Sequence, residues 1–104
     1  MLLDRSVGGE KMIRMKVIDN VKTCQNIKRH MDELAIKPQQ VRQRLYLESV
    51  QSVYKWLDTA KGTSNKKTIP SLDNLVNLAD LFSCSIDELL SCYEVIIDSE
   101  GFAA

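Results

Sequence analysis

The sequence lacks the features that most often mark an enzyme, a membrane protein or a metal protein. Its 104 residues include one histidine, 3 cysteines with no CxxC pair, and neither a glycine-rich phosphate loop nor an HExxH motif. The longest apolar runs, YEVII and NLVNLADLF, are far shorter than the roughly 20 residues needed to cross a bilayer. We expect no signal peptide, because the first residues show no basic region followed by an apolar segment. We therefore expect a cytoplasmic protein that is not an enzyme and binds no metal or other cofactor.

Charges of opposite sign are concentrated in different parts of the chain, although the formal net charge is zero. Residues 11–67 hold 13 Lys and Arg against 5 Asp and Glu, whereas residues 68–104 hold 7 Asp and Glu and no Lys or Arg. This separation indicates an anionic partner for the first part of the chain, and it would also steer one copy toward the opposite end of another. A solvated imbalance of charge with no ligand is the alternative.

The length fits one compact domain. We expect residues 1–19 to form a flexible or extended segment, residues 20–92 the folded domain, and residues 93–104 a C-terminal extension that is either a strand or a dimer contact. Two short apolar runs, MIRMKVI at 12–18 and YEVIID at 93–98, would either pair as strands or extend the neighbouring helices.

The first half of the folded domain is predicted to hold three short helices. Apolar residues spaced by four and three place the first at about 20–34. Pro38 suits the first turn of a second helix, which ends near Leu45. Ser49 can cap a third helix over 49–57. The third helix turns three apolar side chains inward, those of Val53, Trp56 and Leu57.

Two further helices are predicted after an exposed loop at 59–68. Ser71 caps the fourth helix. Its inward side chains are those of Leu72, Leu75, Leu78, Ala79 and Phe82. The run SIDE, residues 85–88, is a capping box that opens the fifth helix. Five short helices with tight connections predict an all-α bundle, with a short two-stranded sheet if the terminal segments pair.

The second and third helices have the plan of a helix-turn-helix. In that arrangement one face of the second of the two helices packs inside and the other enters the major groove of DNA. The outward residues would be Gln51, Ser52, Tyr54 and Lys55, which offer an amide that can pair with adenine, a hydroxyl, a phenol and a cation. Trp56 is assigned to the core rather than to base stacking because of its spacing from Val53.

The stretch from Ile27 to Leu90 resembles the Cro and phage-repressor (XRE-type) family of helix-turn-helix proteins. The resemblance rests on IKPQQVRQRL, on SVQSVYKWL and above all on IPSLDNLVNLADLFSCSIDELL, which matches the family's closing pair of helices. It implies a five-helix, lambda-repressor-like bundle that binds double-stranded DNA as a transcription regulator, in the repressor class. Because so small a module makes few base contacts, we expect a homodimer on a two-fold related site. The acidic fourth and fifth helices with residues 93–97 are the candidate dimer surface.

Further candidate contacts come from positions around the two helices. Gln39 occupies the place where family members hold a phosphate at the start of the second helix. The three lysines of the long loop either meet the DNA backbone or belong to a solvated insertion. The candidate DNA-binding residues are therefore Gln39, Ser49, Gln51, Ser52, Tyr54, Lys55, Lys61, Lys66 and Lys67.

The chain departs from the family pattern at the turn between the second and third helices. Family members usually have a glycine there, where this chain has Tyr46 and one additional residue before the third helix. Either Tyr46 adopts a positive φ at a cost of order 1 kcal/mol, or the extra residue gives the turn another path. An alternative function is a protein-binding module on the same fold, such as an antitoxin or a regulator of a mobile element.

Overall fold

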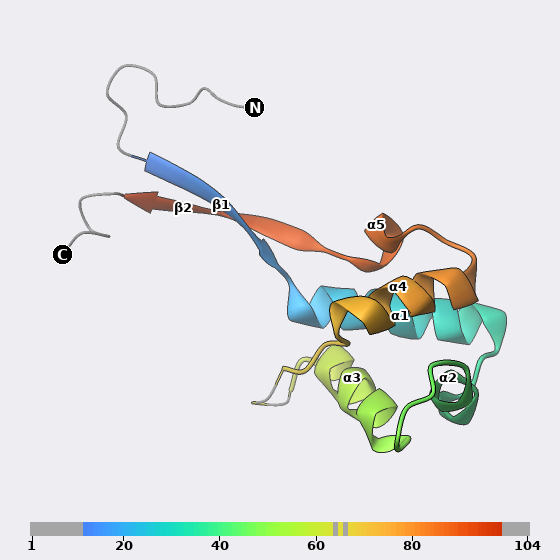
Figure 1. The fold of residues 1–104 in the computed structure, drawn as a ribbon. Coiled ribbons are helices and arrows are strands. Elements are labelled where there is room, and N and C mark those ends of the chain that lie inside the picture. The colour runs from blue at the N-terminus through green and yellow to red at the C-terminus, as the bar shows by residue number, and fades with distance from the viewer. Residues whose placement is uncertain (1–11, 64, 66, 99–104) are drawn as a thin grey trace. The chain divides into compact units, whose positions relative to one another are not determined.

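The computed structural model describes residues 12–63, 65 and 67–98, which form five helices and a two-stranded antiparallel sheet (Figure 1). The chain divides into two compact units. The helical unit is Ile18–Ser91, and the strands, apart from Ile18, belong to the other unit. The predicted helices are confirmed in number and order, and the terminal segments pair as strands rather than extending helices. Residues 1–11 and 99–104 of the predicted terminal segments lie outside the described residues.

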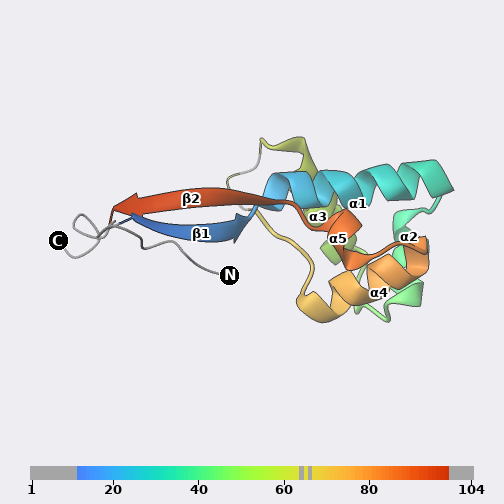
Figure 2. The same cartoon turned by 90° about the horizontal axis from the view of Figure 1, so that it is seen from above.

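The elements follow one another without overlap along the chain. The helices are α1 (Asn20–Leu34), α2 (Pro38–Arg44), α3 (Gln51–Lys61), α4 (Leu72–Phe82) and α5 (Ile86–Leu89). The strands are β1 (Met12–Ile18) and β2 (Cys92–Asp98), which lie side by side in Figure 1 and in Figure 2. The bounds of α1 agree with those predicted from apolar spacing.

Side chains next to the helix ends satisfy backbone N–H groups that the helices leave without partners. The Asp19 carboxylate accepts the N–H of Lys22 at 3.0 Å at the start of α1. The Ser71 hydroxyl accepts the N–H of Asn74 at 3.2 Å, as expected for the cap of α4. In the predicted capping box, the Glu88 carboxylate accepts the N–H of Ser85 at 3.3 Å.

The core of the helical unit is formed by apolar side chains from all five helices. Val53 is fully buried and Trp56 is 3% exposed, so the predicted inner face of α3 is confirmed. The prediction for Leu72 was wrong: its side chain is 68% exposed. Leu72 is the first residue of α4, and the buried stripe of this helix begins one turn later at Leu75. The buried apolar residues are Cys24, Ile27, Met31, Val41, Val53, Trp56, Ala60, Leu75, Leu78, Ala79, Phe82 and Leu89.

Helix α3 is longer than predicted, and its cap differs. It begins at Gln51, with Val50 as the cap residue, and continues to Lys61 before Gly62 ends it at a φ of 76°. Ser49 still contributes, because its hydroxyl accepts the N–H of Gln51 at 2.9 Å. Residues 59–61, which were predicted to begin the loop, therefore belong to the helix.

Two buried threonines hold chain segments that lie far apart in the sequence. The Thr59 hydroxyl donates to the carbonyl of Lys55 at 3.0 Å and accepts the N–H of Thr68 at 2.9 Å. The Thr23 hydroxyl accepts the N–H of Ser91 at 3.1 Å. Thr59 thus fixes the end of the loop after α3 against that helix, and Thr23 fixes the chain after α5 against α1.

Candidate nucleic-acid interface

Helices α2 and α3 are joined by a short turn within the helical unit (Figure 1). Tyr46 in this turn has a φ of 56°, so it takes the first of the two paths expected from the sequence. Its side chain is 92% exposed. The N–H of Leu47 donates to the carbonyl of Arg42 at 3.0 Å and closes the turn onto the end of α2. The turn therefore keeps a left-handed residue at a cost of about 1 kcal/mol that a glycine would avoid.

The outward face of α3 carries four residues at positions i, i+3, i+4 and i+7, which share one side of a helix. Tyr54 is 49% exposed, and Gln51, Lys55 and Asp58 are also exposed. Val53 and Trp56 are buried on the opposite side of the helix. An amide, a phenol, a cation and a carboxylate therefore face away from the core together.

Sequence reasoning missed Asp58, which lies one residue beyond the predicted end of the helix. Its carboxylate lies 3.5 Å from the Nζ of Lys61, so the positive charge of that lysine is partly balanced within the last turn of α3. Both side chains are about two-thirds exposed, at 66% and 68%, and such an ion pair contributes little to stability. The signal was available, because Asp58 follows Tyr54 by four residues.

The remaining predicted site residues lie around this face rather than on it. Ser49 is exposed before α3, and Ser52 is half-buried on the side of that helix. Lys67 is exposed in the loop after α3, and Gln39 is exposed on α2. Lys66 lies outside the described residues. The structure thus gathers Ser49, Gln51, Ser52, Tyr54 and Lys55 around the first turns of α3.

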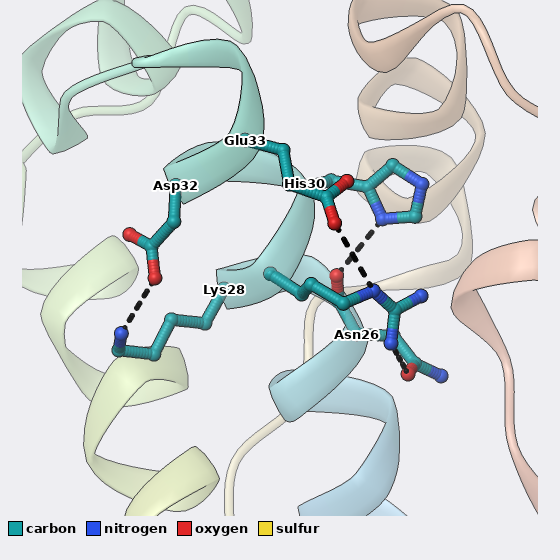
Figure 3. Close-up of polar contacts among 6 residues, drawn as sticks. Asn26, Lys28, His30, Asp32 and Glu33 are labelled. Carbon is teal, nitrogen blue, oxygen red and sulfur yellow. Dashed lines mark hydrogen bonds and ion pairs between the residues drawn. The ribbon is translucent and has the colours of Figure 1, made fainter.

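Cations on α1 and cations on the other two helices are in different environments. On α1, Lys28 lies 2.8 Å from the Asp32 carboxylate and Arg29 lies 4.0 Å from the Glu33 carboxylate (Figure 3). By contrast, three cations of α2 and α3 form no ion pair with another described residue, namely Arg42, Arg44 and Lys55. Their charge is therefore available to an anionic partner.

An open depression of about 350 Å³ lies at the turn between α2 and α3. It is lined by Arg42, Gln43, Tyr46 and Leu47. A guanidinium, an amide and a phenol thus surround a hollow at the end of α2 and in the turn that follows it. Sequence reasoning did not identify this feature, since it depends on the left-handed turn at Tyr46.

The three cysteines are in different environments. Burial raises the pKa of the Cys24 thiol to about 12, and burial together with the nearby Glu88 carboxylate raises the pKa of Cys84. Cys92 is exposed at the start of β2. In the part of the chain that the structure describes, no three His, Cys, Asp or Glu side chains are grouped as metal ligands would be.

The helices of the described segments are short and amphipathic. None of them is long and apolar enough to cross a membrane. Comparison of the chain with models of protein families, with curated proteins and with solved structures gives no significant match.

Proposed function

We propose that the chain is a sequence-specific, DNA-binding transcription regulator of the repressor class, with a lambda-repressor-like arrangement of its five helices. In this proposal α3 enters the major groove of double-stranded DNA. The groove is wide enough to admit a helix, and each base pair presents a distinct pattern of donors and acceptors there.

One observation carries the proposal: α3 buries Val53 and Trp56 while Gln51, Tyr54 and Lys55 remain exposed on its other side. A recognition helix needs this division, because the buried side fixes the helix and the free side reads base edges. Gln51 is suited to a bidentate contact with adenine, and Lys55 to guanine or a phosphate.

The surrounding groups support the same function through contacts to the DNA backbone. Arg42 and Arg44 on α2 are cations without an ion pair among the described residues, and Lys67 is exposed beyond the end of α3. Phosphate contacts of this kind position a protein on DNA and make its affinity fall as salt rises. Gln39 is exposed on α2 and is a candidate for such a contact, whereas the side chain of its neighbour Gln40 accepts the N–H of Lys37 at 2.7 Å.

A single module of this size makes few base contacts, so the proposal includes a homodimer on a two-fold related site. The half-sites are then expected about 34 Å apart, or a multiple of that distance. Selection of bound fragments from a random DNA pool would return an inverted repeat with this spacing.

The test is a salt titration of DNA affinity, measured by fluorescence anisotropy on a selected fragment. We expect affinity to fall steeply between about 50 and 200 mM salt. The double substitution Lys55→Glu with Gln51→Ala should weaken binding by 10-fold or more, about 1.4 kcal/mol. The control Lys22→Glu changes an exposed lysine in the first turn of α1 by the same charge. We expect the control to keep the affinity of the unmodified chain. If the double variant also binds DNA with that affinity, the proposal fails.

Asp58 favours a second candidate function, a protein-binding module on the same fold. Its carboxylate lies on the face proposed for DNA, where it would repel phosphates, and the pair with Lys61 leaves that end of α3 without net charge. A contact of a helix with a protein need not weaken steeply with salt. A chain that shows no salt-dependent binding to any fragment of the random pool would support this alternative.

A further inference from the structure

The ribbon formed by β1 and β2 has one charged face and one apolar face. Arg14 and Glu94 form an ion pair, with Nη1 and Oε1 3.9 Å apart, so both side chains lie on the same face. Successive side chains of a strand point to opposite faces. The other face therefore carries six apolar residues and no charge, and we call it the apolar face: Ile13, Met15, Val17, Tyr93, Val95 and Ile97.

None of the six side chains of the apolar face is buried. Tyr93 is 51% exposed, Met15 48% and Ile13 40%. A two-stranded ribbon alone is at best marginally stable in water, and it usually gains stability from another layer packed on its apolar face. Contiguous exposed apolar groups mark surfaces of interaction.

We infer that the apolar face is the surface through which two copies of this chain associate, with their ribbons stacked face to face. This inference assigns a dimer surface to the proposed function. It rests on that function only for the expectation that two copies of the chain associate. A two-fold contact is self-complementary, because the same patch serves both copies. The apolar face meets that condition, since it carries no charge that would be repeated across the axis.

Charge along the strands favours a second copy as the occupant and selects its orientation. The only charged residues of β1 are the cations Arg14 and Lys16, and those of β2 are the anions Glu94 and Asp98. With a two-fold axis parallel to the strands, β1 of each copy stacks over β2 of the other. The backbones of a basic and an acidic strand then lie about 10 Å apart, the spacing of packed sheets. Their charged side chains point outward, so the attraction between the two ribbons acts over a longer distance and is screened by salt. An axis across the strands would stack like charges instead.

Pairing of the ribbons through their edges is less favourable than stacking. Charged side chains on an outer strand, lysine above all, oppose the addition of another strand. Lys16 of one copy would approach Lys16 of the other if two β1 edges met, and Glu94 would approach Glu94 if two β2 edges met. Stacking avoids both contacts, because these charges lie on the face that points away from the partner.

The size of the apolar face predicts a weak dimer in the absence of DNA. Two such faces would bury together on the order of 800 Å², below the usual range of stable interfaces, so we expect a dissociation constant in the micromolar range or weaker. Simultaneous binding of two half-sites would strengthen the pair, because the second contact becomes intramolecular.

Sedimentation velocity without DNA, from about 5 to about 500 μM chain, tests this surface. The chain offers a matched pair of variants on β2: Tyr93→Lys changes the apolar face, and Ile96→Lys changes the charged face. The two side chains are 51% and 52% exposed. We expect the unmodified chain and Ile96→Lys to dimerise alike, and Tyr93→Lys to raise the dissociation constant about tenfold or more, because it places a charge in the packed layer.

Met15→Lys on β1 should reproduce the effect of Tyr93→Lys. Emission of Trp56, the single tryptophan, shows whether the helical unit is folded in each variant. If the chain stays monomeric at about 500 μM, the inference is wrong. This holds whether the apolar face is covered by the chain's own helices or by another protein. Equal weakening by Tyr93→Lys and Ile96→Lys, or none by Tyr93→Lys, also overturns it. Failure to bind DNA would refute the proposed function and leave this result unchanged, since self-association is measured alone.

Discussion

Replacing Tyr46 by glycine should make the protein more stable, although it removes a large side chain. Tyr46 holds a φ of 56° and is 92% exposed, so truncation forfeits almost no apolar burial. A residue with a Cβ in this conformation costs about 1–2 kcal/mol, which glycine avoids. Glycine in turn gives the unfolded chain more freedom, a loss of about 0.4–1 kcal/mol. The net expectation for Tyr46→Gly is a gain of about 0.5 kcal/mol.

Urea denaturation followed by Trp56 fluorescence can measure this gain, because Trp56 is 3% exposed and reports on the core. Tyr46→Ala is the reference: it removes the same aromatic ring but keeps the strain, so its stability should stay within about 0.5 kcal/mol of the original. Tyr46→Gly should therefore be more stable than Tyr46→Ala, opposite to the usual order of these residues.

Two other positions offer controls for the backbone effect. Ala35 has a φ of 57°, so Ala35→Gly should also stabilise the chain, with hardly any change in side chain. Gly62 has a φ of 76°, and a Cβ there would lie 3.7 Å from Val21 Cγ1, an ordinary contact. Gly62→Ala should thus destabilise by about 1 kcal/mol through strain alone. If Tyr46→Gly is destabilising while both controls behave as expected, the exposed ring contributes to the turn and our reasoning about it is wrong.

Two more predictions concern buried groups. Thr59→Val should lower the free energy of unfolding by about 1–3 kcal/mol, because the N–H of Thr68 loses its acceptor, whereas Thr59→Ser should keep most of it in urea melts. Equal losses for the two would mean that packing of the methyl group matters more than the hydrogen bond. The raised pKa of Cys24, about 12 against 9.0 when unfolded, favours the protonated thiol in the fold. The raised pKa contributes to the free energy of unfolding, and this contribution is complete below pH 9. It is lost as pH rises toward 12, so the free energy of unfolding falls by up to about 1.4 kcal/mol per pH unit. Urea midpoints from pH 8 to 10.5 should show a smaller decline in Cys24→Ala, and an unchanged decline would refute this role.

Apolar spacing and capping residues allowed most of the helices to be predicted, because both are local properties of the sequence. The bounds of α1 and the Ser71 cap of α4 needed no knowledge of the tertiary structure. Composition was a poorer guide at residues 59–61, which resemble a loop but continue α3. There the buried hydroxyl of Thr59 bonds the carbonyl of Lys55 and the N–H of Thr68, and the second partner comes from a segment nine residues away.

The same error hid part of the candidate interface. Ending the third helix at residue 57 left Asp58 out, although one further turn places it beside Tyr54 and Lys55 on the exposed face. That carboxylate changes the chemistry of the face, because it adds a negative charge that opposes phosphate and a group that accepts hydrogen bonds but donates none. Asp58→Asn separates the two candidate functions: it removes the repulsion and should tighten DNA binding in anisotropy measurements, whereas a protein partner that pairs with the carboxylate would bind less well. Weaker binding of Asp58→Asn to DNA would instead indicate that the carboxylate itself reads a base, as it can from the amino group of cytosine.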